Sequence, residues 1–267
     1  MPTLTCDVSE TLMQALLARR AQTGESLSHF VMSSLADTLE VEHSTLFQVS
    51  TAGALVKGVY DGVVTVDELK RHGDFGLGTF DGLDGEMLAL DGHFYQVQAS
   101  GAIREAPDAA TVPFAVVTQF RAERVLALDR VTGFEDLGAQ LDAMRRTNNL
   151  FCAALIEGRF QRVRTRAACK ASPAESPVAA TAHQSEFAFT DKAGKIAGFW
   201  SPPYARSINV AGWHLHFLSD DHTDGGHVLD CQGAGLFAKV QELADVRIAM
   251  PETAAFLQAD LSQDPSR

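Results

Sequence analysis

The sequence predicts a sheet-rich α/β protein of the α+β type, preceded by a small unit of one strand and two helices. From residue 45 onward, short stretches of alternating apolar and polar residues recur between glycine turns, which is typical of strands in a half-buried sheet. Helical periodicity returns there only over Val64–Arg71 and Phe134–Arg145. We therefore expect an N-terminal unit over residues 1–44 and a sheet-dominated domain over residues 45–267.

The composition is that of a water-soluble globular protein. The chain has 267 residues, of which 46% are hydrophobic and 21% charged, enough for one large domain or two smaller ones. No apolar run is long enough to cross a bilayer, and the N-terminus lacks the basic start and apolar stretch of a signal peptide. We expect a cytoplasmic protein without a membrane partner.

Cysteine spacing and net charge narrow the class of ligand. The four cysteines are widely scattered and form no Cys-x-x-Cys pair, so neither a disulfide framework nor a thiolate zinc finger is predicted. The formal net charge of −12 opposes binding to nucleic acid and to anionic lipid. An acidic ligand would need strong local positive charge, which a metal ion and an arginine would supply.

The first residues follow the order strand, helix, turn, helix. Thr3–Val8 alternate between polar and apolar side chains, as a short strand does. Ser9 is suited to cap a helix that Gly24 ends, and Ser26 is suited to start a second helix. The apolar positions of the two helices are Leu12, Leu16, Leu17, Phe30, Val31, Leu35 and Leu39. This order resembles a ribbon-helix-helix unit, a fold in which two copies pair through the strand.

Charge argues against DNA binding by this unit. Its outward strand side chains would be Thr3, Thr5 and Asp7, and residues 1–44 contain six acidic residues against two basic ones. That balance opposes phosphate contacts. We expect the unit to self-associate, which favours a homodimer or a higher homo-oligomer. The alternative is an ordinary helical pair packed on the main body.

Four stretches of the body have the alternation of strands: Ala54–Tyr60, Met87–Leu90, Phe94–Gln98 and Phe114–Phe120. Residues Ala171–Ala182 are mostly Ala, Ser, Pro and Thr, which indicates a surface connection. We expect two sheet lobes with their boundary near residues 165–185.

The strongest local signal is the segment AGWHLHFLSDDHTDGGHVLD. Residues two apart in a strand share a face, so His214 and His216 point the same way while Leu215 points into a core. The polar, glycine-containing stretch that follows is suited to a chain reversal, after which His227 returns alongside the first strand. The spacing therefore predicts three imidazoles at one place.

Three histidines beside a vacant position are typical of a catalytic zinc site, because structural zinc sites usually fill all four positions with protein ligands. Zn²⁺ is the preferred ion, with Mn²⁺ or Fe²⁺ as alternatives. The competing interpretation is that these are isolated surface or core histidines, which is the usual case for any one of them alone. His222 falls in the expected turn and is predicted to be solvated. No pattern supports His29, His43, His72, His93 or His183.

A second dense segment, HGDFGLGTFDGLDGEM, covers His72–Met87. Its glycines indicate tight turns or close backbone approach around Thr79 and Glu86. No Gly-Lys-Ser or Gly-Lys-Thr follows, and the dinucleotide-binding spacing is absent, so this is not a phosphate loop.

Six motifs together resemble the acetolactate decarboxylase family in order and spacing. They are LFQVSTAGALVKGVYDG, GDFGLGTFDGLDGEM, VPFAV, QSEFAF, GFWSPPYARSINVAGWHLHF and GGHVLD. The resemblance covers about Leu46–Leu261 and leaves the N-terminal unit outside.

The resemblance implies an α/β protein built on two packed, mixed or antiparallel sheets with few helices, often dimeric. It implies decarboxylation of (S)-2-acetolactate to (R)-acetoin and CO₂ through a metal-chelated enediolate. Matched motif by motif, the three histidines fall on the family's metal ligands. Glu86, Thr79 and Arg166 fall on its active-site residues.

The chemistry explains why these residue types are needed. A divalent ion chelated by the substrate's hydroxyl and ketone oxygens would stabilise developing negative charge as a Lewis acid. Arg166 would hydrogen-bond the anionic substrate or the enediolate. Glu86 would either ligate the metal or relay a proton to the new carbon centre, and both roles remain open. Thr79 would orient Glu86 or a water.

The chain also departs from the family's pattern. After Arg166 it reads Ala-Ala-Cys-Lys where members commonly carry a run with proline and glutamine. Some members place a further glutamate from the C-terminal tail at the metal, but only Asp260 and Asp264 are near the end of this chain. Two alternative functions remain: a metal-dependent lyase on a homologous 2-hydroxy-3-keto acid, and a metabolite-sensing regulator with an N-terminal association module.

Overall fold

A computed structural model describes residues 5–23, 27–39, 44–171 and 184–262. The chain divides into two compact units, Met1–His43 and Ser44–Arg267. The larger unit contains every residue of the predicted site.

The N-terminal unit consists of two helices, as the sequence predicts. Helix α1 covers Glu10–Thr23 and helix α2 covers Leu27–Leu39. The Ser9 hydroxyl accepts a hydrogen bond from the Leu12 N–H at 3.2 Å, which caps α1. The predicted strand over Thr3–Val8 is not present in its described part, residues 5–8, and residues 3 and 4 lie outside the described ranges. A strand that pairs only with a second copy has no ladder partner within one chain.

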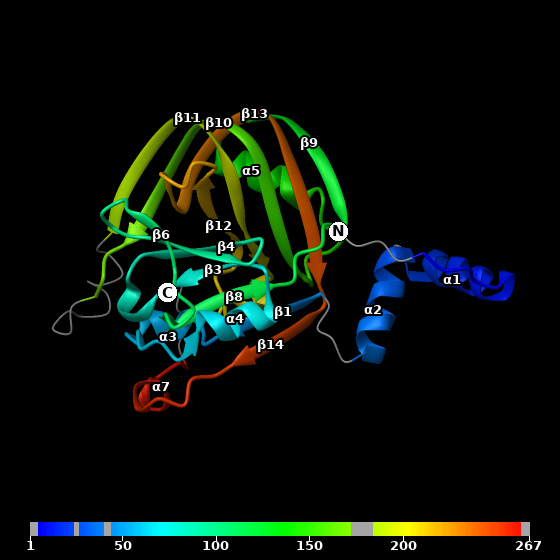
Figure 1. The fold of residues 1–267 in the computed structure, drawn as a ribbon, viewed down its shortest axis with the longest axis horizontal. Helices are drawn as coiled ribbons and strands as arrows, with labels where there is room; N and C mark the ends of the chain where they lie inside the picture. The colour runs from blue at the N-terminus through cyan, green and yellow to red at the C-terminus, as the bar shows by residue number, and fades with distance from the viewer. Residues whose placement is uncertain (1–4, 24–26, 40–43, 172–183, 263–267) are drawn as a thin grey trace. The chain divides into compact units, whose positions relative to one another are not determined.

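A seven-stranded sheet forms the lower layer of the larger unit in Figure 1. Its order is β14 (Asp245–Ala249), β1 (Thr45–Val49), β8 (Phe114–Thr118), β3 (Phe75–Thr79), β4 (Glu86–Leu90), β5 (His93–Val97) and β6 (Ile103–Glu105). Strand β1 runs parallel to β14, whereas its pairing with β8 and the remaining pairings are antiparallel. The sheet is therefore mixed.

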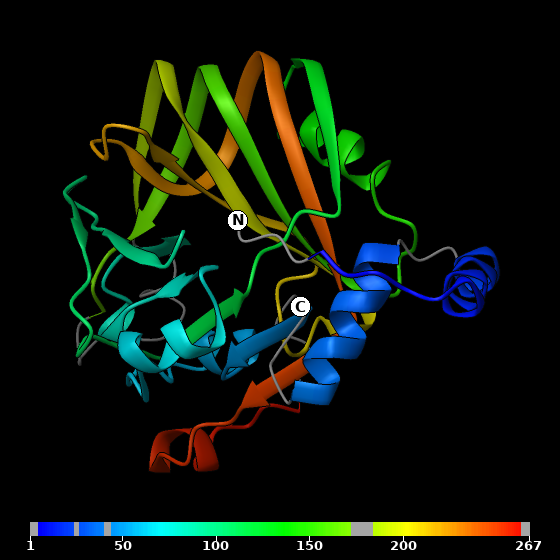
Figure 2. The same cartoon turned by 45° about the vertical axis from the view of Figure 1, so that its right-hand side comes forward.

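A five-stranded antiparallel sheet forms the upper layer. Its order is β10 (Phe151–Ala168), β11 (Gln184–Ser201), β12 (Gly212–Ser219), β13 (Gly225–Leu243) and β9 (Arg124–Val131). Strand β13 also pairs with β10, so the sheet curls round until β12 and β10 share β13 as a neighbour. The long strands arch above the smaller ones (Figure 1, Figure 2).

Short elements complete the larger unit. They are the β2–β7 pair (Val64–Thr65 and Thr111–Val112), α3 (Ala52–Val56), α4 (Val66–His72), α5 (Phe134–Asp142), α7 (Ala254–Gln258) and the 3₁₀ turns η1 (Asp81–Leu83) and η2 (Pro203–Ala205). No helix among the described residues is both long and apolar enough to cross a membrane.

Strand alternation divides the apolar side chains among three cores. On β4, Leu88 and Leu90 belong to the core between the two sheets, whereas Met87 and Ala89 belong to the core beneath the seven-stranded sheet with α4. A third core fills the concave side of the five-stranded sheet, where Leu137 of α5 packs. The prediction of two packed sheets with few helices is confirmed.

Two expectations about the body were wrong, and the first concerns a strand. The stretch Ala54–Tyr60 is not a strand, because its first residues belong to α3, where the Thr51 hydroxyl accepts from the Ala54 N–H. Alternation over so short a stretch does not separate a strand from one buried helical turn, and the cap decides. The other three predicted strands coincide with β4, β5 and β8.

The boundary between the sheets also lies elsewhere than expected. The strands on either side of residues 165–185, β10 and β11, are hydrogen-bonded neighbours in one sheet. The chain changes sheet between β8 and β9 and again between β13 and β14. A run of Ala, Ser and Pro marks a break in regular structure, not a change of layer. Most of that run, residues 172–183, lies outside the described residues.

Candidate metal centre

The two predicted halves of the histidine cluster meet across one strand pair. His216 of β12 lies opposite His227 of β13, and His214 follows two residues away on the same face of β12. The intervening Leu215 packs into the concave core, as the alternation predicts. All three rings therefore enter the layer between the two sheets.

The nitrogen atoms converge closely. His214 Nε2 lies 3.2 Å from His216 Nε2 and 3.1 Å from His227 Nδ1, and one nitrogen from each ring lies within 4.8 Å of the others. Two ligands of a tetrahedral ion at the usual zinc–nitrogen distance are separated by about 3.3 Å. The spacing of the His214 contacts therefore fits a shared cation.

A backbone contact from the opposite sheet orients one of these rings. His216 Nδ1 lies 2.8 Å from the carbonyl oxygen of Met87 on β4. A carbonyl there accepts a hydrogen bond from the Nδ1–H, which leaves the lone pair on Nε2, the nitrogen that faces the cluster. His214 Nδ1 is buried and has no hydrogen-bond partner among the described residues.

Burial keeps the cluster uncharged. Burial lowers the pKa of His216 to about 4, although the Met87 carbonyl acts in the opposite direction. The pKa values of His214 and His227 are lowered well below the usual range by burial first and by the neighbouring imidazoles second. Neutral imidazoles have the free lone pair that a metal ion requires, so the donor set fits a divalent cation at neutral pH.

Glu86, the first residue of β4, faces this cluster from the seven-stranded sheet. Its Oε2 lies 3.5 Å from His216 Nε2, and its Oε1 accepts a hydrogen bond from the Ala168 N–H of β10 at 3.1 Å. Burial raises the pKa of Glu86 to about 7, against the lowering effects of Arg166 and of the Ala168 N–H. Near neutral pH this carboxyl is therefore suited both to give and to take a proton.

Arg166 belongs to β10 and lies opposite His227 of β13, beside the histidine cluster. Its Nη1 donates to the side-chain oxygen of Gln184 at 2.7 Å. Its positive charge lowers the pKa of Glu86 and of all three histidines. The structure therefore brings together the three histidines, Glu86 and Arg166.

Thr79 lies next to Glu86 in the strand register, but its hydroxyl bonds the backbone of the adjoining turn. It lies opposite Glu86 in the β3–β4 pair, and its buried hydroxyl donates to the carbonyl of Gly85 at 2.7 Å. No hydrogen bond joins Thr79 to the Glu86 carboxylate in the described parts of the chain. Any influence of Thr79 on Glu86 therefore passes through the backbone of the turn between the strands.

At two positions near the site, a neighbouring strand's backbone comes so close that only glycine fits. Gly85 has φ +81°, and a Cβ there would meet the Val97 carbonyl oxygen at 2.2 Å. Gly226, directly before His227, has φ +126°, and a Cβ there would lie 2.6 Å from the Arg166 carbonyl oxygen. Both backbone conformations lie in the region that L side chains rarely adopt, so only glycine fits without strain.

The remaining histidines stay apart from the cluster. His222 lies in the β12–β13 turn against the ring of Tyr95, His72 stacks on Phe47, and exposed His93 contacts Glu105. The side chains of the histidines at positions 29, 43 and 183 lie outside the described residues. At the C-terminus, the Asp260 carboxylate accepts from the Ser262 N–H and hydroxyl, and Asp264 lies beyond the described range.

Three contacts of the site were not anticipated from the sequence: the Gln184 side chain on Arg166, the Ala168 N–H on Glu86 and the Met87 carbonyl on His216. Two of them are backbone groups, which no residue type identifies. Gln184 opens the QSEFAF motif, so its place in a family motif was the one available signal.

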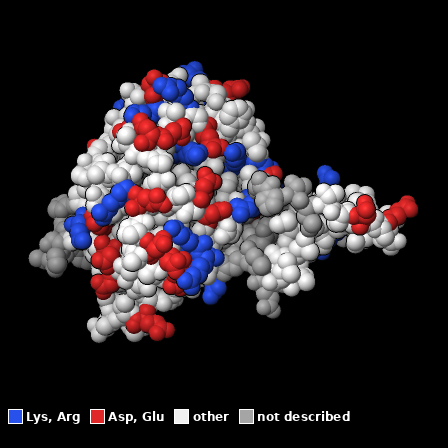
Figure 3. Space-filling model, in the orientation of Figure 1, with Lys and Arg blue, Asp and Glu red and all other residues white. Residues whose placement is uncertain are grey.

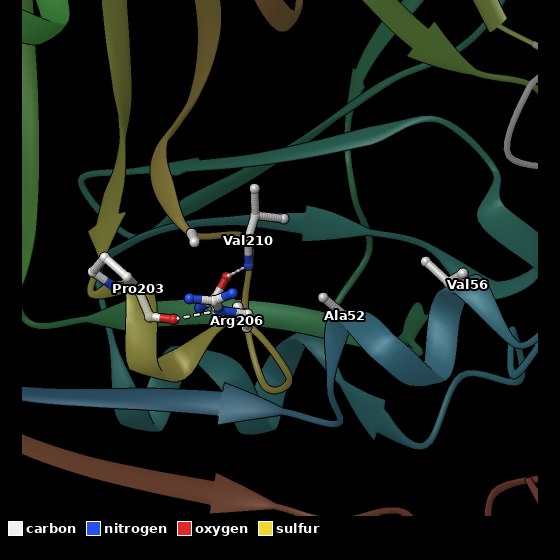
Figure 4. Close-up of a pocket in the computed structure, with 7 residues that line it drawn as sticks. Ala52, Val56, Pro203, Arg206 and Val210 are labelled. Carbon is white, nitrogen blue, oxygen red and sulfur yellow. Dashed lines mark hydrogen bonds between the residues drawn. The ribbon is translucent and has the colours of Figure 1, made fainter. Parts of the chain in front are cut away.

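A separate surface pocket of about 420 Å³ lies between α3 and the loop that leads into β12 (Figure 4). Its lining residues are Ala52, Val56, Pro203, Arg206, Asn209, Val210 and Ala211. None of the predicted site residues lines it. The Arg206 side chain donates to the Pro203 carbonyl at its edge.

Fold and site together define a class: an α+β protein of two packed sheets with a buried three-histidine cluster of the kind that binds a catalytic metal. Residues 46–263 match the family described as alpha-acetolactate decarboxylase. The chain belongs to this family and is thereby an enzyme of the carboxy-lyase class.

Named relatives agree over most of the chain. An alpha-acetolactate decarboxylase of Methanosarcina mazei is 40% identical over 220 residues, 82% of this chain and 76% of that protein. The protein of the same name from Methylococcus capsulatus is 38% identical over 238 residues, 89% of this chain and 92% of its own.

A solved structure shares the fold. The crystal structure of alpha-acetolactate decarboxylase from Bacillus subtilis strain 168 superposes with a TM-score of 0.79 at 34% sequence identity. The match covers 82% of this chain and 94% of that one. The family match begins at residue 46, so the N-terminal helical unit lies outside it.

Replacing Gly226 by alanine is predicted to strain the site far more than the same change at Gly212. Both positions have positive φ, but a Cβ at Gly212 meets nothing within 4 Å, whereas one at Gly226 meets the Arg166 carbonyl. Gly212→Ala should lower the free energy of unfolding by about 1 kcal/mol from backbone strain alone, and Gly226→Ala by at least about twice as much. Urea unfolding of both variants measures this, and equal losses would contradict the steric argument.

Proposed function

We propose that this protein decarboxylates 2-acetolactate to acetoin and CO₂ in a metal-dependent reaction, taking the (S)-acid to (R)-acetoin. The observation that carries the proposal is the meeting of three neutral imidazoles, one carboxyl with a pKa near 7 and one arginine in the layer between the sheets. The names of the relatives support the choice of substrate.

His214, His216 and His227 would hold the divalent ion, for which Zn²⁺ is our first choice and Mn²⁺ or Fe²⁺ the alternatives. Three nitrogen ligands that leave a position open are the pattern of catalytic zinc sites. When bound, such an ion supplies a Lewis acid for the substrate's oxygens. The neutrality of the three rings supports this assignment.

Arg166 would stabilise the charge that develops during the reaction. Cleavage of the bond between the carboxylate and the carbinol carbon releases CO₂ and moves the electron pair towards the ketone, which becomes an enediolate. A guanidinium that bonds the new oxyanion favours the transition state over the bound substrate, and only such interactions raise the chemical rate. The arginine keeps its proton throughout.

Glu86 would then deliver a proton to the carbon that lost CO₂, which completes acetoin. Its pKa near 7 supports this role, because part of the population carries the proton at neutral pH. The Ala168 N–H would hold the carboxyl in place, and delivery from one fixed side would give a single enantiomer.

We further propose that the protein works as a homo-oligomer on a small-molecule partner in the reducing cytoplasm. The four cysteines are free, which supports such a compartment. The formal charge of −12 and the interspersed acidic and basic side chains on the face in Figure 3 give no support to nucleic-acid binding.

Two other functions are distinguishable. A lyase for a homologous 2-hydroxy-3-keto acid with one more methylene would favour that acid over acetolactate in kcat/KM, by about 10- to 200-fold for one methylene. A metabolite-sensing regulator would shift DNA in a salt-dependent gel assay. No observation favours either over the decarboxylase.

The metal proposal is tested by comparing wild type with His216→Ala. Wild type should contain about one divalent ion per chain and release acetoin from acetolactate, lose activity on chelation and regain it with Zn²⁺ or Mn²⁺. The variant should lose the ion and the activity while its circular dichroism remains that of wild type. His93→Ala, an exposed histidine, is the control. A metal-loaded wild type without acetoin release would overturn the proposed function.

Glu86→Gln separates the two roles left open for this residue. The amide oxygen can still accept from the Ala168 N–H, but the side chain can no longer donate an acidic proton. We expect kcat to fall by about 10²- to 10⁴-fold with the metal content unchanged. Glu105→Gln, at an exposed carboxylate, should leave kcat unaffected. Loss of the metal from Glu86→Gln would instead identify Glu86 as a ligand.

Self-association through the N-terminal unit is tested with lysines on its apolar faces. Leu17 of α1 and Leu35 of α2 are 47% and 39% exposed although apolar. The double variant Leu17→Lys/Leu35→Lys should reduce the molar mass of the full chain in light scattering. The control, Gln14→Lys/Ser34→Lys, adds the same charge at exposed polar positions and should keep the wild-type mass. Equal masses for both variants would exclude these faces from the interface.

A further inference from the structure

The hairpin of β10 and β11 places an acid directly beside the arginine of the site. Arg166 lies opposite Glu186 in the register, Arg164 lies opposite Ala188, and Ala168 lies opposite Gln184. Residues opposite each other in an antiparallel pair project on the same side of the sheet, close enough to interact. The position of Glu186 would therefore allow an ion pair that neutralises Arg166.

The side chains avoid that pair by crossing diagonally. The Glu186 carboxylate accepts from Arg164 Nη2 at 3.1 Å, and Arg166 donates in the other direction to the neutral Gln184 amide at 2.7 Å. The acid is thus held by the neighbouring arginine. Arg166 is oriented by a group that carries no charge.

This arrangement preserves a positive charge where the site needs one. The protein carries a net charge of −12, so an anionic substrate gains attraction only from local cations. Arg166 lies opposite His227 in the β10–β13 register, so its guanidinium charge is placed beside the histidine cluster. An acid paired with Arg166 would offset that charge and occupy N–H groups that could otherwise bind an anionic ligand.

We propose that Arg164 and Gln184 are positioning residues for Arg166. Arg164 holds the Glu186 carboxylate away from Arg166, and Gln184 orients the Arg166 guanidinium. Arg166 therefore keeps an uncompensated charge that can bind the oxyanion formed in the reaction. The proposal rests on the proposed function, because it assigns Arg166 an anionic substrate. A purely structural reading of the Arg164–Glu186 pair predicts little effect on removal, since Arg164 and Glu186 are 41% and 52% exposed and exposed ion pairs contribute little to stability.

The test first releases the Glu186 carboxylate from Arg164 and then removes its negative charge. Arg164→Gln should lower kcat/KM for acetolactate at least about 10-fold, because the released carboxylate pairs with Arg166. Adding Glu186→Gln to that variant should restore kcat/KM to within about 2-fold of wild type. Gln184→Glu, which places an acid on Arg166 directly, should reproduce the loss. Metal content and melting temperature should remain those of wild type throughout.

The matched control lies on the same hairpin. Arg159 and Asp191 form another exposed ion pair, 62% and 75% exposed and away from the site, so Arg159→Gln should leave kcat/KM unchanged. Wild-type activity in Arg164→Gln, or a loss that Glu186→Gln does not rescue, would overturn the proposal. A crystal structure of Arg164→Gln provides a readout that does not depend on activity. In it the Glu186 carboxylate should form an ion pair with Arg166. If Glu186 stays away from Arg166, the proposal is overturned, even if no variant forms acetoin.

Discussion

The contact between His216 and the Met87 carbonyl is the interaction on which the site depends. It joins β12 of the curled sheet to β4 of the flatter one and fixes which nitrogen of the ring faces the cluster. A second link, from the Ala168 N–H to Glu86, ties β10 to the same strand. With both links in place the imidazoles and the carboxyl meet, although they belong to different sheets.

Burial between the sheets sets the chemistry of every group there. Removing a carboxyl from water opposes its ionisation, and removing an imidazole opposes its protonation. The same layer therefore raises the pKa of Glu86 and lowers those of the three histidines. Both shifts lead towards neutral groups, so the cluster can accept a cation and an anionic ligand without first losing or gaining protons.

Arg166 brings a positive charge to this layer, and its surroundings preserve it. The acid nearest in register is bonded to Arg164, and the direct partner of Arg166 is an amide. In a protein with a large negative net charge, this separation of partners determines whether the site attracts an anion.

The sequence alone determined the convergence of His214, His216 and His227, because two-residue spacing and a glycine turn fix which side chains share a face of adjacent strands. Glu86 and Arg166 were predictable only through the family motifs, since nothing local distinguishes them from surface charges. The tertiary structure alone decided the helix α3 within an alternating stretch, the point where the chain changes sheet, and the contacts from Met87, Ala168 and Gln184. Most of these contacts join positions about 80 to 130 residues apart. Periodicity reports which face a residue occupies, whereas only the packing of the layers determines what lies opposite that face.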